Sequence, residues 1–344
     1  MMRLSRILGR IVLIGVLLIV ATPGVRAADG ATLAQARARG VLRCGVSEGI
    51  AGFSSRNASG AWTGIDVDFC RAVAAAVLDG PDKVEYVPLR ASERFPALRE
   101  GAIDLLARNT TWTLLREGAL GVQFAGILFH DGQTFLVKAQ GAPQTLAGLK
   151  DATVCVKKDT TSQDHLLAYS TAHSLNLRPV VVASTTEASA ALFSGRCRAW
   201  TSDASQLAAA RSIAPGGPSS WIIMPERISQ EPLGPVVRDD DPKWLVLVRW
   251  VLIALVRAEQ LGLTRENVAF RSHEAAVRAS LVTDDDVDRS LDVAPGWMLR
   301  AVRAAGSYGE MFDRNLGARS PLGLERGANR LWTQGGLMYA PPLR

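Results

Sequence analysis

The sequence has little of what metal or nucleotide chemistry requires. Its four histidines show no His-Glu-x-x-His spacing, its four cysteines include no Cys-x-x-Cys pair, and it contains neither G-x-x-x-x-G-K-[ST] nor G-x-G-x-x-G after a strand. Those spacings matter because the ligands or backbone N–H groups must converge on one ion or phosphate. We therefore expect no cofactor and no metal, and surface or capping roles for His130, His165, His173 and His273.

Long apolar runs are also scarce beyond the N-terminus. The richest stretch, residues 244–256, is interrupted by Arg249 and bounded by Asp241 and Arg257. A bilayer-spanning helix needs about 20 predominantly apolar residues. This stretch predicts a buried helix instead.

The N-terminus has the three-part layout of a secretory signal peptide. Three arginines precede the apolar run 11–21, and small residues at positions 25 and 27 suit a cleavage site. A membrane anchor is the alternative, but the run is too short to cross ~30 Å of hydrocarbon. We expect residues 1–27 to be a signal peptide cleaved after Ala27. Because no cysteine follows that site, a lipid-anchored form is not expected.

The net charge must be corrected for this leader. The whole chain carries +6, but residues 1–27 contain four arginines and no acid, which leaves 35 basic and 33 acidic residues, or +2. A basic chain can indicate nucleic acid or an anionic membrane surface. A nearly neutral mature chain does not, so we expect no nucleic-acid partner.

The four cysteines fit an oxidising compartment, where paired cysteines form disulfides. Four cysteines allow three pairings. The first two and the last two fall in different halves of the chain, which favours Cys44–Cys70 and Cys155–Cys197. Four free buried thiols would be expected only in a reducing cytoplasm.

Strands alternate with amphipathic helices, which predicts an α/β fold of parallel sheets covered by helices. In the first set, Asp66 is the expected helix cap; strands are expected at 41–46, 84–87 and 103–107, and helices at 67–78 and 92–100. In the second set, strands are expected at 134–138, 153–157, 179–182 and 198–201, and helices at 142–149, 162–172, 185–193 and 204–211.

Two sets of similar size predict two lobes. We expect residues 28–130 to form the first part of lobe 1 and residues 131–226 to form lobe 2. Residues 227–344 then return to lobe 1 through a strand at 235–238 and end in a helical extension that begins with 244–261. Two chain crossings, near 129–132 and 225–234, would make a hinge and a cleft between the lobes.

One motif points to an enzyme. Residues 45–49 match G-x-S-x-G, the nucleophile elbow of α/β-hydrolases, which needs a helix directly after the serine. Residues 50–64 contain three glycines and no helical periodicity. We therefore interpret the motif as a match of sequence letters alone and not as a hydrolase site.

A polar cluster follows the third expected strand of lobe 1. The cluster that comes directly after that strand is Arg108, Asn109, Thr110 and Thr111, and Arg116 follows five residues after Thr111. Ligands of α/β proteins bind at the carboxyl ends of sheet strands, and an arginine can hold a carboxylate through two parallel hydrogen bonds. The alternative is a turn with a solvated arginine.

Two segments of the second half could complete the site. Thr160 and Thr161 open a helix after a strand, where hydroxyls and free N–H groups favour an anion. Asp203 ends another strand and could pair with an ammonium group. Plain capping by Asp159 or Ser162 and by Asp203 is the alternative. Together, an arginine for a carboxylate, an aspartate for an ammonium and hydroxyls from both lobes describe a site for a zwitterionic amino acid.

From Thr32 to the C-terminus the chain resembles the periplasmic amino-acid-binding subunits of ABC importers, and most of all the general L-amino-acid-binding proteins. The stretches that carry the resemblance are CGVSEGIAGFS, WTGIDVDFCRAVAAAV, ERFPALREGAIDLLARNTTWTLLR, SGRCRAWTSD, EPLGPVVR, YGEMFDRN and SPLGLERGANRLWTQGGLMYAPP. The resemblance implies a two-lobed periplasmic-binding-protein fold that closes over an L-amino acid and delivers it to membrane permease subunits. A periplasmic, monomeric, non-enzymatic protein is the corresponding expectation.

The resemblance also implies residue roles. The arginine at the position of Arg116 grips the α-carboxylate, aided by Asn109 and Thr111. The pair Thr160 and Thr161 contributes from the second lobe, and Asp203 holds the α-ammonium group.

The chain departs from the family pattern at three places. Asp159 stands where a glycine usually precedes the threonine pair, Ser202-Asp203-Ala204 replaces a more usual Thr-Asp-Gln, and Ile50 stands where many relatives stack an aromatic residue. These departures concern side-chain specificity rather than the head-group site.

Two other functions compete with transport. A cyclohexadienyl dehydratase-like enzyme on the same scaffold would need a carboxylate in the cleft as a general acid, for which Glu48 is the candidate. A sensor module would require a spanning helix or a signalling domain, and the sequence shows neither.

Overall fold

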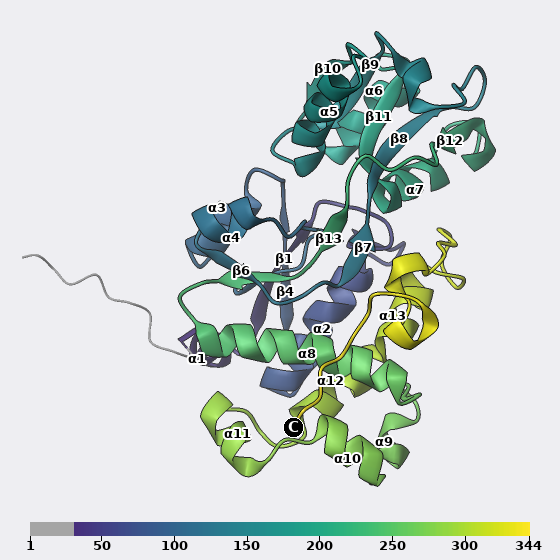
Figure 1. Cartoon of the computed structure of the whole chain (residues 1–344). Coiled ribbons are helices and arrows are strands. Elements are labelled where there is room, and N and C mark those ends of the chain that lie inside the picture. Colours follow the sequence, from purple (N-terminus) through teal and green to yellow (C-terminus); the bar gives the residue numbers. More distant parts are fainter. Residues whose placement is uncertain (1–30) are drawn as a thin grey trace, which may run out of the picture.

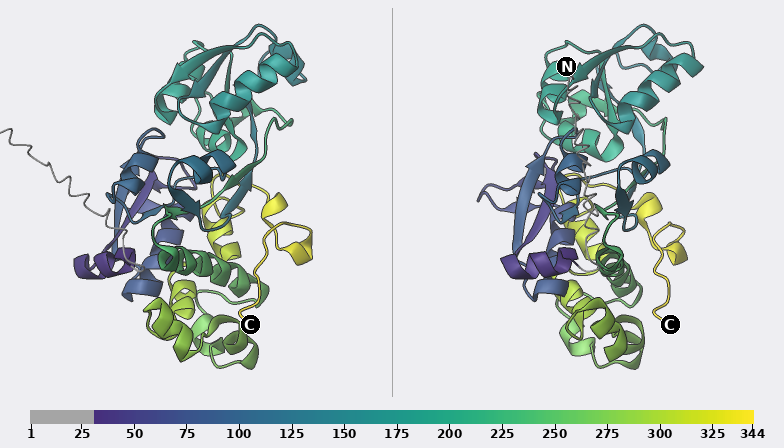
Figure 2. Two further views of the ribbon diagram at one scale, coloured as in Figure 1. Left: turned by 60° about the vertical axis from the view of Figure 1, so that its left-hand side comes forward. Right: turned by 90° about the vertical axis from the view of Figure 1, so that its left-hand side faces the viewer.

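The computed structural model describes residues 31–344, so the expected signal peptide lies outside the described residues. The described chain forms two lobes joined by a pair of strands (Figure 1). Lobe 2 is a contiguous part of the chain, whereas lobe 1 combines the N-terminal third with the C-terminal helices, as two further views show (Figure 2).

Lobe 1 contains a five-stranded sheet in the order β4-β1-β5-β14-β6. Its strands are β1 (Leu42–Ser47), β4 (Val84–Leu89), β5 (Leu105–Leu106), β6 (Val122–Phe124) and β14 (Val236–Arg238). The strands β4, β1 and β5 run parallel, but β14 pairs antiparallel with both β5 and β6. The expectation of a purely parallel sheet was wrong here, because β14 returns from lobe 2 and enters the sheet from the opposite end.

Helices of both chain ends cover lobe 1. The N-terminal part supplies α1 (Ala31–Arg39), α2 (Ile65–Leu78), α3 (Arg94–Arg99), α4 (Leu114–Ala119) and the short hairpin β2 (Ser55–Arg56) and β3 (Trp62–Thr63). The C-terminal part supplies α8 (Pro242–Gln260), α9 (Val268–Arg271), α10 (Ala275–Leu281), α11 (Asp285–Leu291), α12 (Trp297–Ala305), α13 (Tyr308–Asn315), and the 3₁₀ turns η3 (Gly327–Asn329) and η4 (Trp332–Gln334).

The main core of lobe 1 joins α2 to the C-terminal helices. The apolar residues of α2 pack with those of α8, α12 and α13 in one buried cluster. Arg300 of α12 donates hydrogen bonds to the carbonyl oxygens of Ala75 and Ala76 at 3.3 and 3.0 Å, which satisfies carbonyls in the last turn of α2. The helical C-terminal extension is therefore an integral layer of this lobe.

The apolar stretch that was expected to form a buried helix is α8. Its residues Val248, Val251 and Leu255 are fully buried in the lobe 1 core. Among the helices of residues 31–344, none combines the length and the apolarity that a bilayer span needs.

Lobe 2 contains a second five-stranded sheet in the order β10-β9-β11-β8-β12. Its elements are β8 (Gln133–Lys138), η1 (Leu146–Leu149), β9 (Thr153–Lys157), α5 (Thr161–Ala172), β10 (Arg178–Val182), α6 (Thr185–Phe193), β11 (Ala199–Asp203), α7 (Ala204–Ser212), η2 (Pro218–Ser220) and β12 (Trp221–Ile223). β9 runs parallel to β10 and β11, and β8 pairs antiparallel with β11 and β12, so this sheet is also mixed. The helix expected at 142–149 is only the 3₁₀ turn η1.

Side chains of β8 alternate between the two faces of this sheet. Phe135 and Val137 join the cluster with Leu166 of α5, whereas Leu136 joins the opposite cluster with Leu192 of α6. Successive residues of a strand point to opposite faces. Because this sheet is covered on both sides, the consecutive apolar residues 135–137 are all buried.

One disulfide cross-links each of the two large sheets to a neighbouring segment. Cys44 on β1 is bonded to Cys70 on α2, and Cys155 on β9 to Cys197 before β11. The favoured pairing of the three is confirmed.

The two lobes are linked by antiparallel strands, β7 (Phe129–Asp131) and β13 (Glu231–Leu233). Asn329 in η3 holds β7: the His130 backbone N–H donates to Asn329 Oδ1 at 2.7 Å, and Asn329 Nδ2 donates to the His130 carbonyl at 3.0 Å. The C-terminal extension thereby attaches one linking strand to lobe 1.

Candidate functional site

A buried cavity between the lobes collects all six residues that the sequence proposed as ligand contacts. Its volume is only about 20 Å³ in this structure. Its lining residues are Arg94, Arg108, Asn109, Thr111 and Arg116 of lobe 1, and Lys157, Thr160, Thr161, Ser162, Ser202, Asp203 and Gln206 of lobe 2. These residues follow strands β4, β5, β9 and β11, at the sheet edges where α/β proteins bind ligands.

Arg116 lies in the first turn of α4, which Thr113 caps by accepting the Arg116 backbone N–H at 3.2 Å. The guanidinium is 8% exposed and donates to the Thr111 carbonyl at 2.5 Å. It forms no ion pair with another described residue, and burial lowers its pKa. Arg116 is therefore a buried cation whose remaining N–H groups are available to a carboxylate.

Asn109 stands in a left-handed conformation, with φ +33°, at the end of β5. Its backbone N–H donates to Asp66 Oδ2 at 3.2 Å, and its side-chain oxygen is buried without a hydrogen-bond partner. Asp66 was expected to cap α2, but Gly64 occupies the N-cap and Asp66 lies in the first turn. Asp66 instead shapes the cavity wall through Asn109, and burial raises the pKa of Asp66 to about 7.

Asp203 ends β11 on the opposite wall. It occupies the N-cap position of α7, but its side chain forms no capping hydrogen bond, so the plain capping interpretation does not describe it. The side chain is 6% exposed. Burial, followed by the charges of Asp131 and Glu231, raises the pKa of Asp203. A cation placed beside Asp203 would reverse that shift.

The N-terminus of α5 forms the third part of the wall. Thr160 is its N-cap residue, and the Thr160 hydroxyl donates to the Lys157 carbonyl at 2.7 Å. Neither Asp159 nor Ser162 caps the helix, and Asp159 is exposed with φ +58°. The first N–H groups of a helix have no acceptor within it and favour an anion.

The hydroxyls of Thr111 and Thr161 are already used in this structure. Both donate to Glu231 Oε2 of the linking strand β13, at 2.6 and 3.1 Å. A hydroxyl has a single proton to donate, so these two side chains join the lobes through Glu231 rather than pointing a free donor into the cavity. Sequence reasoning missed Glu231.

Glu231 is fully buried and holds one more group of lobe 2. His165 Nδ1 lies 3.0 Å from Glu231 Oε1, and Ser229 donates to the same oxygen at 2.6 Å. Burial alone would raise the pKa of Glu231, but the close contact with His165 and the hydrogen bonds from the hydroxyls outweigh it and lower that pKa. The contact with Glu231 also raises the pKa of His165. We call Glu231, Thr111, Thr161 and His165 the interlobe latch.

Two cations of the wall, Arg94 and Lys157, were also missed, and Arg108 was expected in the polar cluster but was given no role of its own. Lys157 ends an expected strand, so the rule that located Asn109 could have located it too. Arg94 begins α3, five residues after β4. An isolated basic residue at a helix start carries no such signal.

The enzyme candidates do not form a site. Glu48 does not line the cavity and lies 3.6 Å from Arg90 in an ion pair. Ser47, the serine of the G-x-S-x-G match, is buried with its hydroxyl 2.6 Å from that of Ser54, and no helix directly follows it. Ile50 is buried in the lobe 1 core and does not line the cavity.

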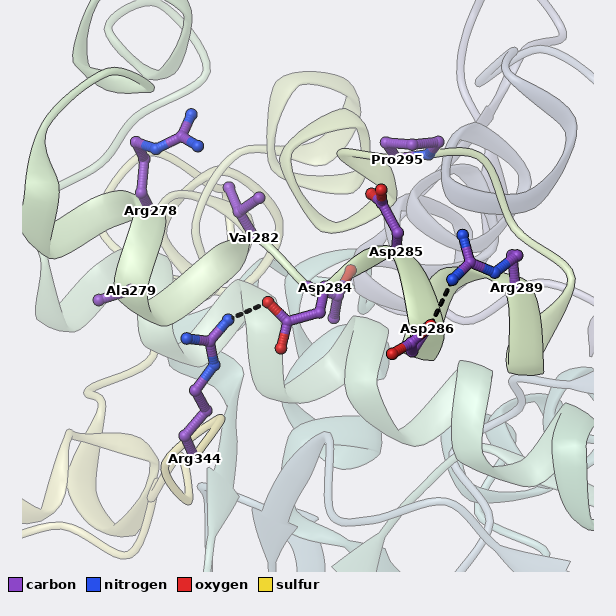
Figure 3. Close-up of a pocket in the computed structure, with 10 residues that line it drawn as sticks. Arg278, Ala279, Val282, Asp284, Asp285, Asp286, Arg289, Pro295 and Arg344 are labelled. Carbon is purple, nitrogen blue, oxygen red and sulfur yellow. Dashed lines mark hydrogen bonds and ion pairs between the residues drawn. The ribbon is translucent and has the colours of Figure 1, made fainter.

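A second, open hollow lies on the C-terminal helices and has a volume of about 800 Å³ (Figure 3). Two of its arginines are paired with acids of the same hollow: Arg344 with Asp284, and Arg289 with Asp286. Within residues 31–344, no cluster of histidine, cysteine and acidic side chains could hold a metal ion. The interlobe cavity is therefore the better candidate site.

Comparison with known proteins gives concordant matches. The model of bacterial extracellular solute-binding proteins, family 3, matches residues 42–271. The general L-amino acid-binding periplasmic protein of Rhizobium johnstonii is 42% identical over 325 residues, which covers 93% of this chain and 95% of that protein. The glutamate/glutamine/aspartate/asparagine-binding protein of Rhodobacter capsulatus is 42% identical over 321 residues, or 92% of this chain and 95% of that protein.

A solved structure is similarly close. An ABC transporter periplasmic binding protein from Brucella ovis, with glutathione bound, superimposes with a TM-score of 0.88 at 41% sequence identity. The match covers 92% of this chain and all of the Brucella chain.

Proposed function

The chain belongs to the bacterial extracellular solute-binding proteins of family 3, and from that premise we propose that it is the subunit of an ABC importer that binds L-amino acids in the interlobe cavity. Two relatives that are 42% identical over nearly their whole length are named a general L-amino acid-binding periplasmic protein and a putative amino-acid ABC transporter-binding protein.

One observation carries the proposal. Arg116 of lobe 1 and Asp203 of lobe 2 line the same buried cavity, and each lacks an ion-pair partner among the described residues. A buried charge without a partner is costly. The α-carboxylate and α-ammonium groups of an amino acid would supply both missing partners at once. Asn109 and the N-terminus of α5, with Thr160 and Thr161, are the proposed additional contacts.

The placement of the two charges also explains closure. A ligand held by Arg116 and Asp203 touches both lobes, so it stabilises the conformation in which the lobes approach each other. The linking strands β7 and β13 are the only places where the described chain passes between the two sheets. The closed form is then the state that the permease subunits recognise.

The remaining assignments follow from this role. We propose a periplasmic protein exported by the signal peptide of residues 1–27, acting as a monomer with permease subunits as partners and performing no chemistry. A dehydratase would need a cleft acid in the position proposed for Glu48, and Glu48 is engaged with Arg90 outside the cavity. Incubation with prephenate or arogenate should therefore release no product.

Glutathione is a second candidate ligand, since the Brucella relative was solved with it bound. The γ-glutamyl end of glutathione carries a free α-carboxylate and α-ammonium group. Arg116 and Asp203 would hold that end as they hold an amino acid.

Calorimetry on the purified protein tests the head-group site. Arg116→Ala should weaken the binding of every amino acid that the wild type binds by at least 100-fold, which corresponds to about 3 kcal/mol for a buried charge left unpaired. Arg289→Ala is the matched control, because Arg289 is 70% exposed and pairs only with Asp286. Unchanged binding in Arg116→Ala would refute the site assignment.

A further inference from the structure

The N-terminus of α7 is capped by a residue from outside the helix. Asp131 ends the linking strand β7, and its Oδ2 accepts hydrogen bonds from the backbone N–H of Ser205, at 3.2 Å, and from the Ser205 hydroxyl. Next to it, the Gly132 carbonyl accepts the Ala204 N–H at 2.9 Å. The first N–H groups of a helix have no acceptor within it. Residues 131 and 132 therefore supply the acceptors for the first two N–H groups of α7.

The side chain in the N-cap position takes no part in this cap. Asp203 occupies that position, and an aspartate there ordinarily accepts the N–H of the second or third helical residue. The Asp203 carboxylate forms no capping hydrogen bond, and the second helical residue, Ser205, already donates to Asp131. Asp203 instead lines the cavity. Asp131 thus supplies the cap that α7 would otherwise take from Asp203.

The sheet of lobe 2 brings Asp131 to the start of α7. Gln133 begins β8 two residues after Asp131, and it pairs with Asp203 at the end of β11 in the antiparallel ladder of these strands. The end of β7 and the start of α7 are therefore neighbours. The Gly132 N–H donates to Asp131 Oδ1 at 2.8 Å, which orients the carboxylate so that Oδ2 faces Ser205.

Asp131 has a counterpart on the second linking strand. It lies directly opposite Glu231 in the ladder of β7 and β13. Glu231 accepts the hydroxyl of Thr161, the first residue of α5, just as Asp131 accepts the hydroxyl of Ser205 in the first turn of α7. Each linking strand thus sends one carboxylate to the start of a lobe 2 helix, and both helices contribute residues to the cavity wall.

We infer that Asp131 is a positioning residue for the ammonium site, because by capping α7 it keeps the Asp203 carboxylate free for the ligand. This role rests on the proposed function, in which Asp203 holds the α-ammonium group. Without Asp131 the Ser205 N–H would lack its acceptor, and Asp203 stands where an aspartate caps a helix. A ligand would then have to displace Asp203 from that cap before its ammonium group could bind.

A purely electrostatic effect of Asp131 is the alternative to capping. After burial, the charge of Asp131 is the next cause of the raised pKa of Asp203, so the two carboxylates act on each other. Loss of the Asp131 charge alone would therefore change the potential at the ammonium site. Asparagine separates the two effects, because it has nearly the size of aspartate and caps helices about as well but carries no charge.

Calorimetry compares the two substitutions, with the common amino acid that a thermal-shift screen of the wild type ranks first as the probe. We expect Asp131→Ala to lower its affinity roughly 5- to 30-fold, because the ligand must overcome an N-cap of ordinary strength. Asp131→Asn should stay within about threefold of the wild type, since its side-chain oxygen still accepts the Ser205 N–H. Ser307→Ala is the matched control, because it removes the side-chain cap of α13, a helix that does not line the cavity.

Thermal unfolding of the ligand-free protein tests the exchange of caps without a ligand. In the wild type, Asp203→Ala removes a buried carboxylate that has no partner, so the melting temperature should stay the same or rise. In the Asp131→Ala background the same substitution removes the replacement cap, so the melting temperature should fall.

The outcomes distinguish the positioning role from the proposed function. If the wild type binds no amino acid, the proposed function fails and the positioning role falls with it. If the wild type binds and Asp131→Ala binds equally well, the proposed function stands and the positioning role is refuted. Equal losses in Asp131→Ala and Asp131→Asn would assign the effect to charge and would also overturn it, as would the same response to Asp203→Ala in both backgrounds.

Discussion

The interlobe latch predicts that one buried carboxylate sets the ease of lobe closure. Replacing Glu231 by glutamine keeps the size of the side chain and removes its charge. Opening of the lobes should leave the contact between Thr111 and Glu231 intact, because Thr111 is bridged to Leu233 of the same linking strand. Opening would instead break the contacts of Glu231 to lobe 2, which come from Thr161 at 3.1 Å and His165 at 3.0 Å.

The magnitude follows from those two contacts. A hydrogen bond to a charged group contributes about 1 kcal/mol more than a neutral one. The His165 side chain is 37% exposed, so solvent screening reduces the ion pair to about 1 kcal/mol at most. Glu231→Gln should thus disfavour the closed state by about 2 kcal/mol, which corresponds to a roughly 30-fold loss of amino-acid affinity when the ligand-free protein is mainly open.

Calorimetry with a well-bound amino acid measures this loss. Glu226→Gln is the control, since Glu226 accepts the Leu146 N–H at 3.2 Å within lobe 2 and does not bridge the lobes. The removal of a negative charge would by itself favour a ligand carboxylate. An unchanged or increased affinity in Glu231→Gln would therefore refute the latch.

Three further predictions concern pH, covalent cross-linking and the hinge. The protonated form of His165 makes the latch ion pair, and the pKa of His165 is raised above 6.5, so its contribution is complete below pH 6.5 and is lost as pH rises through the raised value. Amino-acid affinity should therefore fall more steeply from pH ~6 to pH ~9 in the wild type than in His165→Asn, in which Lys157 and Asp66, both with a pKa of about 7, still titrate. Replacing Cys155 and Cys197 together by serine opens a link with a sequence separation of 42 and should lower the free energy of unfolding by roughly 4 kcal/mol in denaturant titrations. A variant as stable as the wild type under non-reducing conditions would contradict this expectation. Asn329→Ala leaves the two His130 backbone groups without their partner and should lower the free energy of unfolding by about 2 kcal/mol, unlike Asn57→Ala in an exposed turn.

Local signals predicted much of the fold and the proposed site. The strand at 153–157 and the helix at 185–193 have the expected bounds, because apolar periodicity and flanking polar residues determine both ends of such elements. Asn109, Thr111 and Asp203 lie in the cavity because each follows a strand, and parallel strands bring their carboxyl ends to one edge. These inferences need only the neighbouring residues.

Features that depend on distant pairing were not predictable in this way. Nothing near Glu231 indicates that Thr111 and Thr161, which are 120 and 70 residues away, will donate to it. The Asp66 cap was wrong because the carboxylate is used by the Asn109 backbone, a contact across 43 residues. The mixed sheets were missed because strand direction depends on where the chain returns, which hydrophobic pattern does not encode.

The position of β14 has a consequence for how the chain folds during synthesis. All strands of the lobe 2 sheet lie between residues 133 and 223, so this sheet can be completed as soon as those residues are available. The lobe 1 sheet needs Val236–Arg238 between β5 and β6, and α2 needs its partner α12, more than 200 residues later. Such distant contacts form slowly. A growing chain should therefore carry a finished second lobe beside an unfinished first one until its C-terminal helices have been made.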